Sequence, residues 1–346
     1  MNPEAAPTPM EMAMHGDWML MFHGQAFLNY TDQSGPRGGD KVFSTNWIMP
    51  MAERPLAGGQ LMFRAMFSLE PATVAEKYPE LFQTGETIHG RPIVDAQHPH
   101  DFFMELAAEY AHPVDASTTA YIYAAPVGDP ALGPVAYPHR ASAMEIPQAA
   151  LAHHLQDSTH IAASVITVGA QRGLFGAAFS GFHGREPDEQ RWNIDTGAID
   201  SWSVRATFDP TPNWSAQVST GHLKSPEAAE PDRDAQRTTA SLAYSKDGWS
   251  SSLIFGRNRN LNSVTAESVL RIASRNFITG RAEVVDKDEL FDHGVYRIKA
   301  VTLGYTRDVL SNVGVGGNVT LYSIPDALNG EYGSRPRSLY LFVRLR

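Results

Sequence analysis

The sequence predicts an all-β protein, a single antiparallel β-barrel of the kind that crosses a membrane with its strands. Two segments near the start alternate cleanly between apolar and polar side chains over about 10 residues, as a membrane-spanning strand requires. The second half of the chain reads as a succession of hairpins. No apolar run approaches the ~20 residues of a transmembrane helix, a test that does not apply to barrel strands because half of their side chains face the lumen.

The first spanning strand is predicted at 18–30. Side chains alternate faces along a strand, so one face is apolar and the other carries Met19, Met21, His23, Gln25 and Asn29. The segment 60–70 repeats the pattern: Leu61, Phe63, Ala65, Phe67 and Leu69 lie on one face, and Met62, Arg64, Met66 and Glu70 on the other. Between them, 42–51 alternates less cleanly.

From residue 159 onward the hairpin pattern predicts eleven further strands. An Asp-Gly pair at 247–248 marks one tight turn. We expect about 14 strands in the barrel, with 12 to 16 compatible with the pattern and an even number required for closure. The alternative is a soluble β-sandwich or barrel with the aromatic residues in a core. The predicted ranges are 159–169, 173–183, 201–209, 214–223, 238–245, 249–257, 263–274, 277–285, 295–306, 314–323 and 338–346.

Two long insertions interrupt the strands, at about 71–117 and 128–158. Each is predicted to be partly helical, with helices near 99–110 and 147–155, and to form a plug or lid. No linker divides the chain. The predicted organisation is therefore a Met/His-rich flexible tail over 1–16 and one barrel domain over 17–346.

Composition narrows the class of protein. A formal net charge of -10 argues against nucleic-acid binding, and the absence of cysteine excludes disulfides and thiolate chemistry. The first residues lack the basic and apolar regions of a secretory signal. We nevertheless predict the cell outer membrane as the location, because of the strand pattern, and expect the start to be internal or processed.

Methionine is concentrated at the start of the chain, where ten of the 12 methionines lie within the first 66 residues. Thioethers select soft ions such as Cu(I), and imidazole binds copper in both oxidation states. Copper is therefore the one cofactor predicted. The alternative is that methionine fills irregular gaps in packing. The candidate ligands are Met10, Met12, Met14 and His15 in the tail, and Met19, Met21, His23, Met62 and Met66 on the polar strand faces.

Histidine is concentrated in and next to the two insertions, since eight of the 13 histidines lie between residues 89 and 160. Imidazoles beside carboxylates are typical of metal sites, but no defined zinc motif is present. The alternative is that they hydrogen-bond neighbouring loops and fix a plug. The candidate residues are His98, His100, Asp101, His153, His154, Asp157 and His160.

A third candidate is the charged loop at 184–192, interpreted as a salt-bridged gate or a solvated surface loop. Its charged residues are Arg185, Glu186, Asp188, Glu189 and Arg191. Catalysis is not expected: no Gly-x-Ser-x-Gly turn is present, and nothing orders a Ser-His-acid relay.

Seven short motifs together resemble a family of uncharacterised bacterial outer-membrane-type β-barrels, and that resemblance extends over nearly the whole chain. The architecture is also similar to the copper-resistance B family, in which a Met/His-rich tail precedes an outer-membrane barrel. This second resemblance implies a metal role only for Met10, Met12, Met14 and His15. The motifs lie at 35–39, 66–73, 98–101, 139–142, 153–160, 184–189 and 217–222.

The sequence thus predicts an outer-membrane barrel for copper or soft-metal binding, efflux or resistance. Its expected partners are outer-membrane lipid and a periplasmic metal carrier or efflux component. The first alternative is a passive porin or structural barrel with a plug braced by His and Asp. The second is a barrel that carries a metal-dependent enzyme site.

Overall fold

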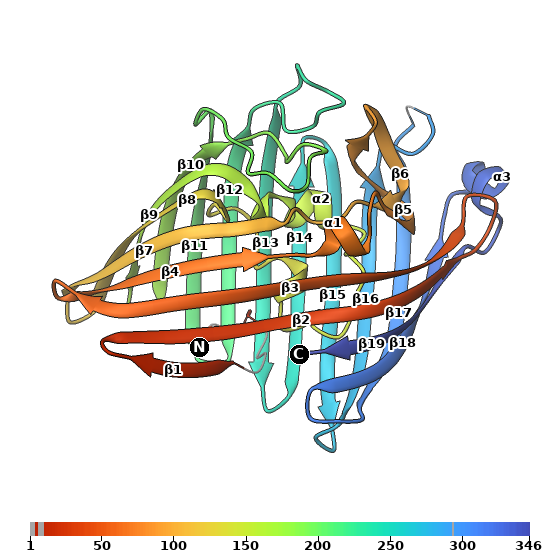
Figure 1. The fold of residues 1–346 in the computed structure, drawn as a ribbon. Helices are drawn as coiled ribbons and strands as arrows, with labels where there is room; N and C mark the ends of the chain where they lie inside the picture. Colours follow the sequence, from red (N-terminus) through yellow and green to blue (C-terminus); the bar gives the residue numbers. More distant parts are fainter. Residues whose placement is uncertain (1–3, 6–9, 293) are drawn as a thin grey trace.

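In a computed structural model that describes residues 4–5, 10–292 and 294–346, a closed antiparallel barrel dominates the chain (Figure 1). The barrel is formed by one 17-stranded sheet. Sixteen of its strands close the barrel, because the last strand pairs with β2, and one strand lies outside the closure. The closing strands are β2 (Trp18–Gln33), β3 (Gly39–Leu56), β4 (Gly59–Phe67), β7 (Phe103–Asp115), β8 (Thr118–Gly128), β9 (Ala162–Arg172), β10 (Phe175–His183), β11 (Ser201–Thr211), β12 (Trp214–Leu223), β13 (Ala235–Lys246), β14 (Trp249–Asn258), β15 (Leu261–Ile272), β16 (Asn276–Lys287), β17 (Tyr296–Asp308), β18 (Val313–Ser323) and β19 (Arg337–Leu345).

The remaining elements are short. A separate hairpin joins β5 (Tyr78–Ile88) to β6 (Arg91–Gln97). No helix in the described part of the chain is both long and apolar enough to cross a membrane. The helical turns are α1 (Glu70–Thr73), α2 (His153–Gln156), α3 (Asn329–Tyr332), η1 (Tyr137–His139), η2 (Ser158–His160) and η3 (Asp326–Leu328).

The prediction of about 14 strands was too low by one hairpin, β7–β8. A helix was predicted over 99–110 because Pro99 suits a first helical turn and because large apolar residues from Phe102 to Tyr110 recur at helical spacing. The segment instead begins β7 at Phe103, where it pairs with β4 on one side and β8 on the other. Long-range pairing overrides local helix propensity here. The first insertion therefore spans 68–102 rather than 71–117.

The predicted strand faces are confirmed. Leu28 is 57% exposed, Leu341 52% and Leu303 66%, all on the outer surface. Inward-facing Thr31, Thr265 and Arg344 are completely buried. An apolar exterior and a polar interior are what a barrel in lipid requires, and they exclude the alternative of a soluble sandwich with its aromatic residues inside.

The two ends of the barrel differ. At one end every connection is short, such as 57–58 and 247–248. At the other end lie both insertions and the longer loops, including 184–200 and 224–234. This asymmetry of short turns and long loops is that of outer-membrane barrels.

The tail was predicted to be flexible, but residues Glu11–His15 form a strand. β1 (Glu11–His15) pairs antiparallel with the start of β2, from His15 opposite Trp18 to Glu11 opposite Phe22. It takes the edge of β2 that β19 does not reach, because β19 pairs only with residues from Ala26 onward. Residues 1–3 and 6–9 of the tail lie outside the described residues.

Candidate functional site: a plug held inside the barrel

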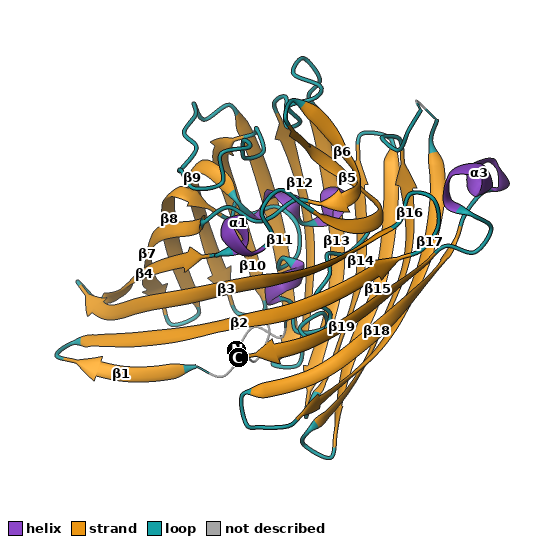
Figure 2. Cartoon of the chain, turned by 45° about the vertical axis from the view of Figure 1, so that its right-hand side comes forward, coloured by secondary structure: helices purple, strands orange, loops and turns teal. Residues whose placement is uncertain are grey.

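The second insertion, residues 129–161, runs through the barrel lumen, between the near and far walls in Figure 2. Its backbone N–H groups donate to wall hydroxyls, from Ala131 to Ser180 Oγ and from Gly133 to Ser219 Oγ, both over 2.8 Å. Gln148 bonds Asn318 on β18 in both directions, over 2.8 and 3.0 Å. Because these partners lie on different strands around the barrel, the insertion fills the lumen and is called the plug below.

The predicted helix at 147–155 is reduced to α2, because the preceding backbone bonds other parts of the molecule. Ala150 O accepts a hydrogen bond from Gln83 of β5 over 2.8 Å, and Ala152 N donates to Glu283 of β16 over 3.2 Å. The carbonyl of Gln148 accepts from Arg281 over 3.2 Å. Backbone groups used in this way are not available for helical i to i+4 bonds.

A buried ion-pair network joins the plug to the wall. Arg140 bonds Asp157 within the plug over 2.8 Å and Glu267 of β15 over 2.5 Å. Glu267 also accepts from Arg281 of β16 over 2.9 Å. Burial raises the pKa of Asp157, but Arg140 and His153 outweigh it, so the pKa lies below its usual value. The network is therefore ionised and mutually compensated.

A second group of ion pairs fixes the far tip of the plug near the short-turn end. The Glu145 carboxylate is completely buried and accepts hydrogen bonds from Arg344 and, over 3.1 Å, from Arg346. Both arginines also pair with Asp308 of β17. The plug is thus tied to the wall by arginine–carboxylate pairs at its tip as well as at Arg140.

The β5–β6 hairpin lies at the long-loop end. Leu81 and Phe82 pack with Leu151, Val285, Ile298 and Tyr332 in one buried cluster. The Phe82 and Tyr332 ring centroids are 4.3 Å apart. The hairpin therefore packs between the plug and the wall strands β16 and β17.

The charged loop predicted as a gate, residues 184–192, is part of a longer connection, 184–200, that holds this hairpin. Glu189 accepts hydrogen bonds from the backbone N–H groups of His89 and Gly90, over 2.8 and 3.0 Å, and from Thr87 Oγ1. Arg191 pairs with Glu86 and, over 3.2 Å, with Asp101.

The other predicted gate residues have different roles. Glu186 lies 3.7 Å from His154 Nδ1 and accepts from Ser158 Oγ over 3.3 Å. Asp188 bonds only its own loop, at Gln190 and Asp195, and Arg185 is exposed.

The two insertions meet at a cluster of five histidines, His98, His100, His153, His154 and His160, called the histidine cluster below. Neighbouring ring centroids are 5.2 to 5.9 Å apart. The Nε2 atoms of His100, His154 and His160 are buried without a hydrogen-bond partner, and that of His98 lies 3.2 Å from Glu86 Oε1. Histidines of the two insertions thus lie together in space.

Charges around the cluster set its protonation. Burial lowers the pKa of His98 and His160 well below the usual value, and that of His153 to about 4. His100 is the exception: burial lowers its pKa, but Glu70, bonded to its Nδ1 over 3.0 Å, outweighs burial and raises it. Burial also raises the pKa of Glu86 to about 7, against the opposing effect of Arg191.

The candidate metal ligands are distributed among the region of β1, the inward faces of β2 and β4, and the histidine cluster. Within residues 4–5, 10–292 and 294–346, no three or more His, Asp or Glu side chains are arranged to hold a metal ion. Met12 and Met14 of β1 are 66% and 68% exposed. By strand register, Met19, Met21, Met62 and Met66 point into the lumen, as predicted. His23 Nε2 lies 3.2 Å from the sulfur of Met49, a residue that the sequence did not single out.

Two groups of charged residues were not among the candidates predicted from the sequence. Glu70 and Glu86 pair with the histidine cluster from the first insertion. Arg140, Glu145, Glu267 and Arg344 form the ion pairs of the plug. A signal was present for two of them, because Glu267 and Arg344 occupy inward positions of predicted strands, where a charge requires a partner.

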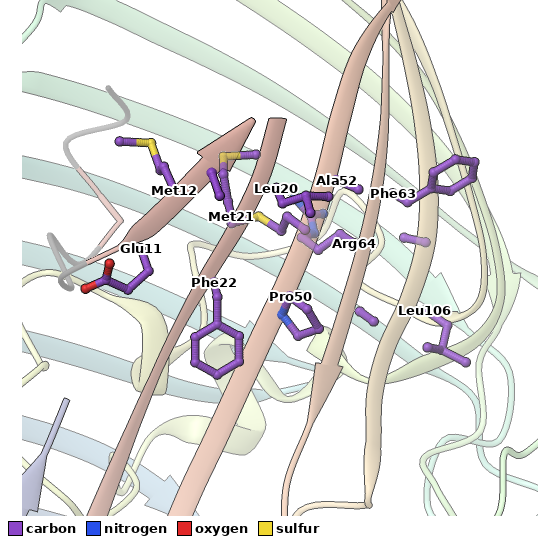
Figure 3. A pocket seen from close by; sticks show the side chains of 14 residues that line it. Glu11, Met12, Leu20, Met21, Phe22, Pro50, Ala52, Phe63, Arg64 and Leu106 are labelled. Atoms are coloured by element: carbon purple, nitrogen blue, oxygen red, sulfur yellow. The ribbon is translucent and has the colours of Figure 1, made fainter. Parts of the chain in front are cut away.

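A groove on the outer wall, shown in Figure 3, is not part of this site. It has a volume of about 700 Å³ and is lined mainly by outward-facing side chains of β2, β3, β4 and β7. Leu20, Phe22, Phe63 and Leu106 line it, together with Ala52 and Ala65. It belongs to the apolar exterior.

The fold is that of the general porins. OmpF of Salmonella typhi, solved with daunomycin, superposes with a TM-score of 0.62 over 97% of this chain and 99% of its own, at 9% identity. An anion-selective porin from Comamonas acidovorans gives 0.59 over 94% and 99%, at 11% identity. OmpT of Vibrio cholerae gives 0.54 over 97% and 99%, at 7% identity.

At these identities the comparisons establish a porin-like barrel and nothing finer. No protein-family model matches the chain, and no curated protein is significantly similar in sequence. The resemblance to the copper-resistance B family therefore stays a prediction.

Proposed function

We propose that this protein is a plugged porin of the outer membrane, in which the passage of small solutes depends on displacement of the plug. The apolar exterior, the porin-like fold and the asymmetric ends support the membrane location. Of the functions predicted from the sequence, this one is nearest to the passive porin with a braced plug.

The observation that carries the proposal is the burial of the lumen wall beneath the plug. Barrels of 16 to 18 strands are wide enough for an aqueous channel. Here Ser203 and Thr265, which point inward, are completely buried, and Arg281 is 2% exposed. Polar wall residues that would line a water-filled channel instead contact protein.

Planar-bilayer conductance tests the proposal, with a variant that lacks the plug. An alanine Cβ at Gly133 would lie 2.5 Å from Gln156 O, so the two ends of the segment 134–156 are adjacent. That segment can be replaced by a linker of a few glycines without stretching the wall. The control variant removes 227–232, from a loop outside the lumen.

We expect low conductance from the intact protein and from the control, and an increase of at least roughly tenfold from the plug-deleted variant, because an empty 16-strand barrel holds water. A large stable conductance from the intact protein would contradict the plugged state. Heat-modifiable migration on gels checks that the deleted variant has folded.

Soft-metal binding is the second candidate function, favoured by the contact of His23 Nε2 with Met49 Sδ over 3.2 Å. Thioether and imidazole together suit Cu(I). Trp47 packs against His23 on one side and His139 of the plug on the other, with ring centroids 5.1 and 4.3 Å apart.

Competition for Cu(I) with a chromogenic chelator tests this candidate. We expect stoichiometric binding that is weakened at least roughly tenfold by Met49→Leu, a substitution that keeps volume and removes the sulfur. Met62→Leu is the control for methionine loss elsewhere in the lumen. Equal affinity in both variants and the intact protein would exclude Met49 as a ligand.

A further inference from the structure

The loop at 184–200 has two sides of different chemistry. Its inward side carries Glu189 and Arg191, which hold the β5–β6 hairpin. Its outward side carries two large apolar residues, Trp192 at 55% exposure and Ile199 at 52%. Because Arg191 and Trp192 are consecutive, one short segment joins the first insertion to the outside of the barrel.

Trp192 extends an aromatic group on the outer wall. Its ring centroid lies 5.5 Å from that of Phe102, which in turn lies 5.4 Å from Phe67 and 4.8 Å from Phe103. Phe67 and Phe103 are register partners at the ends of β4 and β7. Phe67 shares the outward face with Phe63, which is 46% exposed.

The apolar surface continues on both sides of Trp192. Leu69, just beyond β4, is 53% exposed, and Trp202 at the start of β11 is 40% exposed. Ile199 lies against β10, where a Cβ on Gly181 would approach its Cγ2 to 3.0 Å. Trp192 and Ile199 of the loop thus add to the apolar outer surface that is otherwise formed by the strands.

We infer that the loop at 184–200 is seated in lipid, with Trp192 and Ile199 at the boundary between acyl chains and headgroups. This inference rests on the proposed membrane location. Lipid is favoured as the occupant because Trp192 packs on Phe102, which packs on Phe67 of the outward face of β4, and because tryptophan concentrates at membrane interfaces. Lipid contact then holds Glu189 and Arg191 against the β5–β6 hairpin.

Site-directed spin labelling tests the inference, since the chain has no cysteine and each variant carries a single label. The variants are Trp192→Cys and Ile199→Cys, in phosphatidylcholine vesicles. Collision rates of the nitroxide with oxygen, which partitions into lipid, are compared with those of a water-soluble nickel chelate. Leu303→Cys on the mid-wall of β17 is the lipid control, and Arg185→Cys in the same loop is the aqueous control.

We expect labels at 192 and 199 to favour oxygen over the chelate by at least about fivefold relative to the label at 185. If 192 and 199 behave like 185 while 303 reports lipid, the inference is wrong and the membrane barrel stands. If 192 and 199 are shielded from both reagents, protein covers the patch and the inference is again wrong. If 303 also reports water, the proposed function itself fails.

Discussion

Arg140 of the plug donates a hydrogen bond to Glu267 of β15, with side chains 1% and 0% exposed. The two residues are 127 positions apart in the chain. Burying two charges is costly unless each is compensated, and here Asp157 and Arg281 complete the network. The plug is therefore held in the lumen by electrostatic pairing as well as by apolar packing.

Replacing Arg140 with methionine should destabilise the protein by about 3–5 kcal/mol, because Asp157 and Glu267 would each lose a buried cationic partner. Urea unfolding in detergent micelles, followed by tryptophan fluorescence, measures the loss. Arg297→Met is the control, since Arg297 pairs with Asp286 but its side chain is 61% exposed. Equal stability of the two variants would show that the buried network contributes little.

His139→Phe should make the protein less sensitive to acid. Burial, together with nearby His23 and His100, lowers the pKa of His139 to about 3 in the folded state, below the ordinary 6.5. Between those values the unfolded chain binds a proton that the folded protein does not, so stability falls as pH decreases. The slope from this group is about 1.4 kcal/mol per pH unit.

The phenylalanine variant lacks this proton and keeps an aromatic ring against Trp47, whose centroid lies 4.3 Å away. We expect the difference in unfolding free energy between variant and parent to grow from pH 6.5 towards pH 4. A difference that is independent of pH would show that the folded-state pKa is not lowered.

Glu189→Ala should release the turn of the β5–β6 hairpin. The carboxylate accepts hydrogen bonds from the backbone N–H groups of His89 and Gly90 and from the hydroxyl of Thr87. In the alanine variant these three donors can bond only to water. Hydrogen exchange followed by mass spectrometry should show faster exchange at 87–90. Asp188→Ala, whose carboxylate bonds only its own loop, should leave those amides unchanged.

Gly85→Ala should separate the hairpin from the plug. Gly85 has φ +116°, and a Cβ there would lie 2.3 Å from Cε1 of His154. The clash should cost about 1–3 kcal/mol beyond the backbone strain. Gly90→Ala provides the comparison, since Gly90 also has positive φ but no heavy atom lies within 4 Å of its Cβ position. Equal losses of unfolding free energy in the two variants would mean that His154 moves away from the added Cβ at little energetic cost.

Much of the wall could be predicted from the sequence. In β2, β4, β11 and β19 the alternation of side chains identified which face meets the exterior, because a strand has a fixed period of two. The hairpin β7–β8 could not be found in this way. Its first strand is rich in helix-favouring residues, and only pairing with β4 and β8 makes it extended.

For the site, the sequence by itself determined that the histidines lie in the insertions and that methionines line one face of the first strands. Only the tertiary structure decided that His98 and His154 meet, that Glu86 and Glu70 join them, and that Arg140 finds Glu267. The physical reason is that a periodic pattern specifies local direction, whereas contacts between residues over a hundred positions apart depend on how the whole barrel closes around its plug.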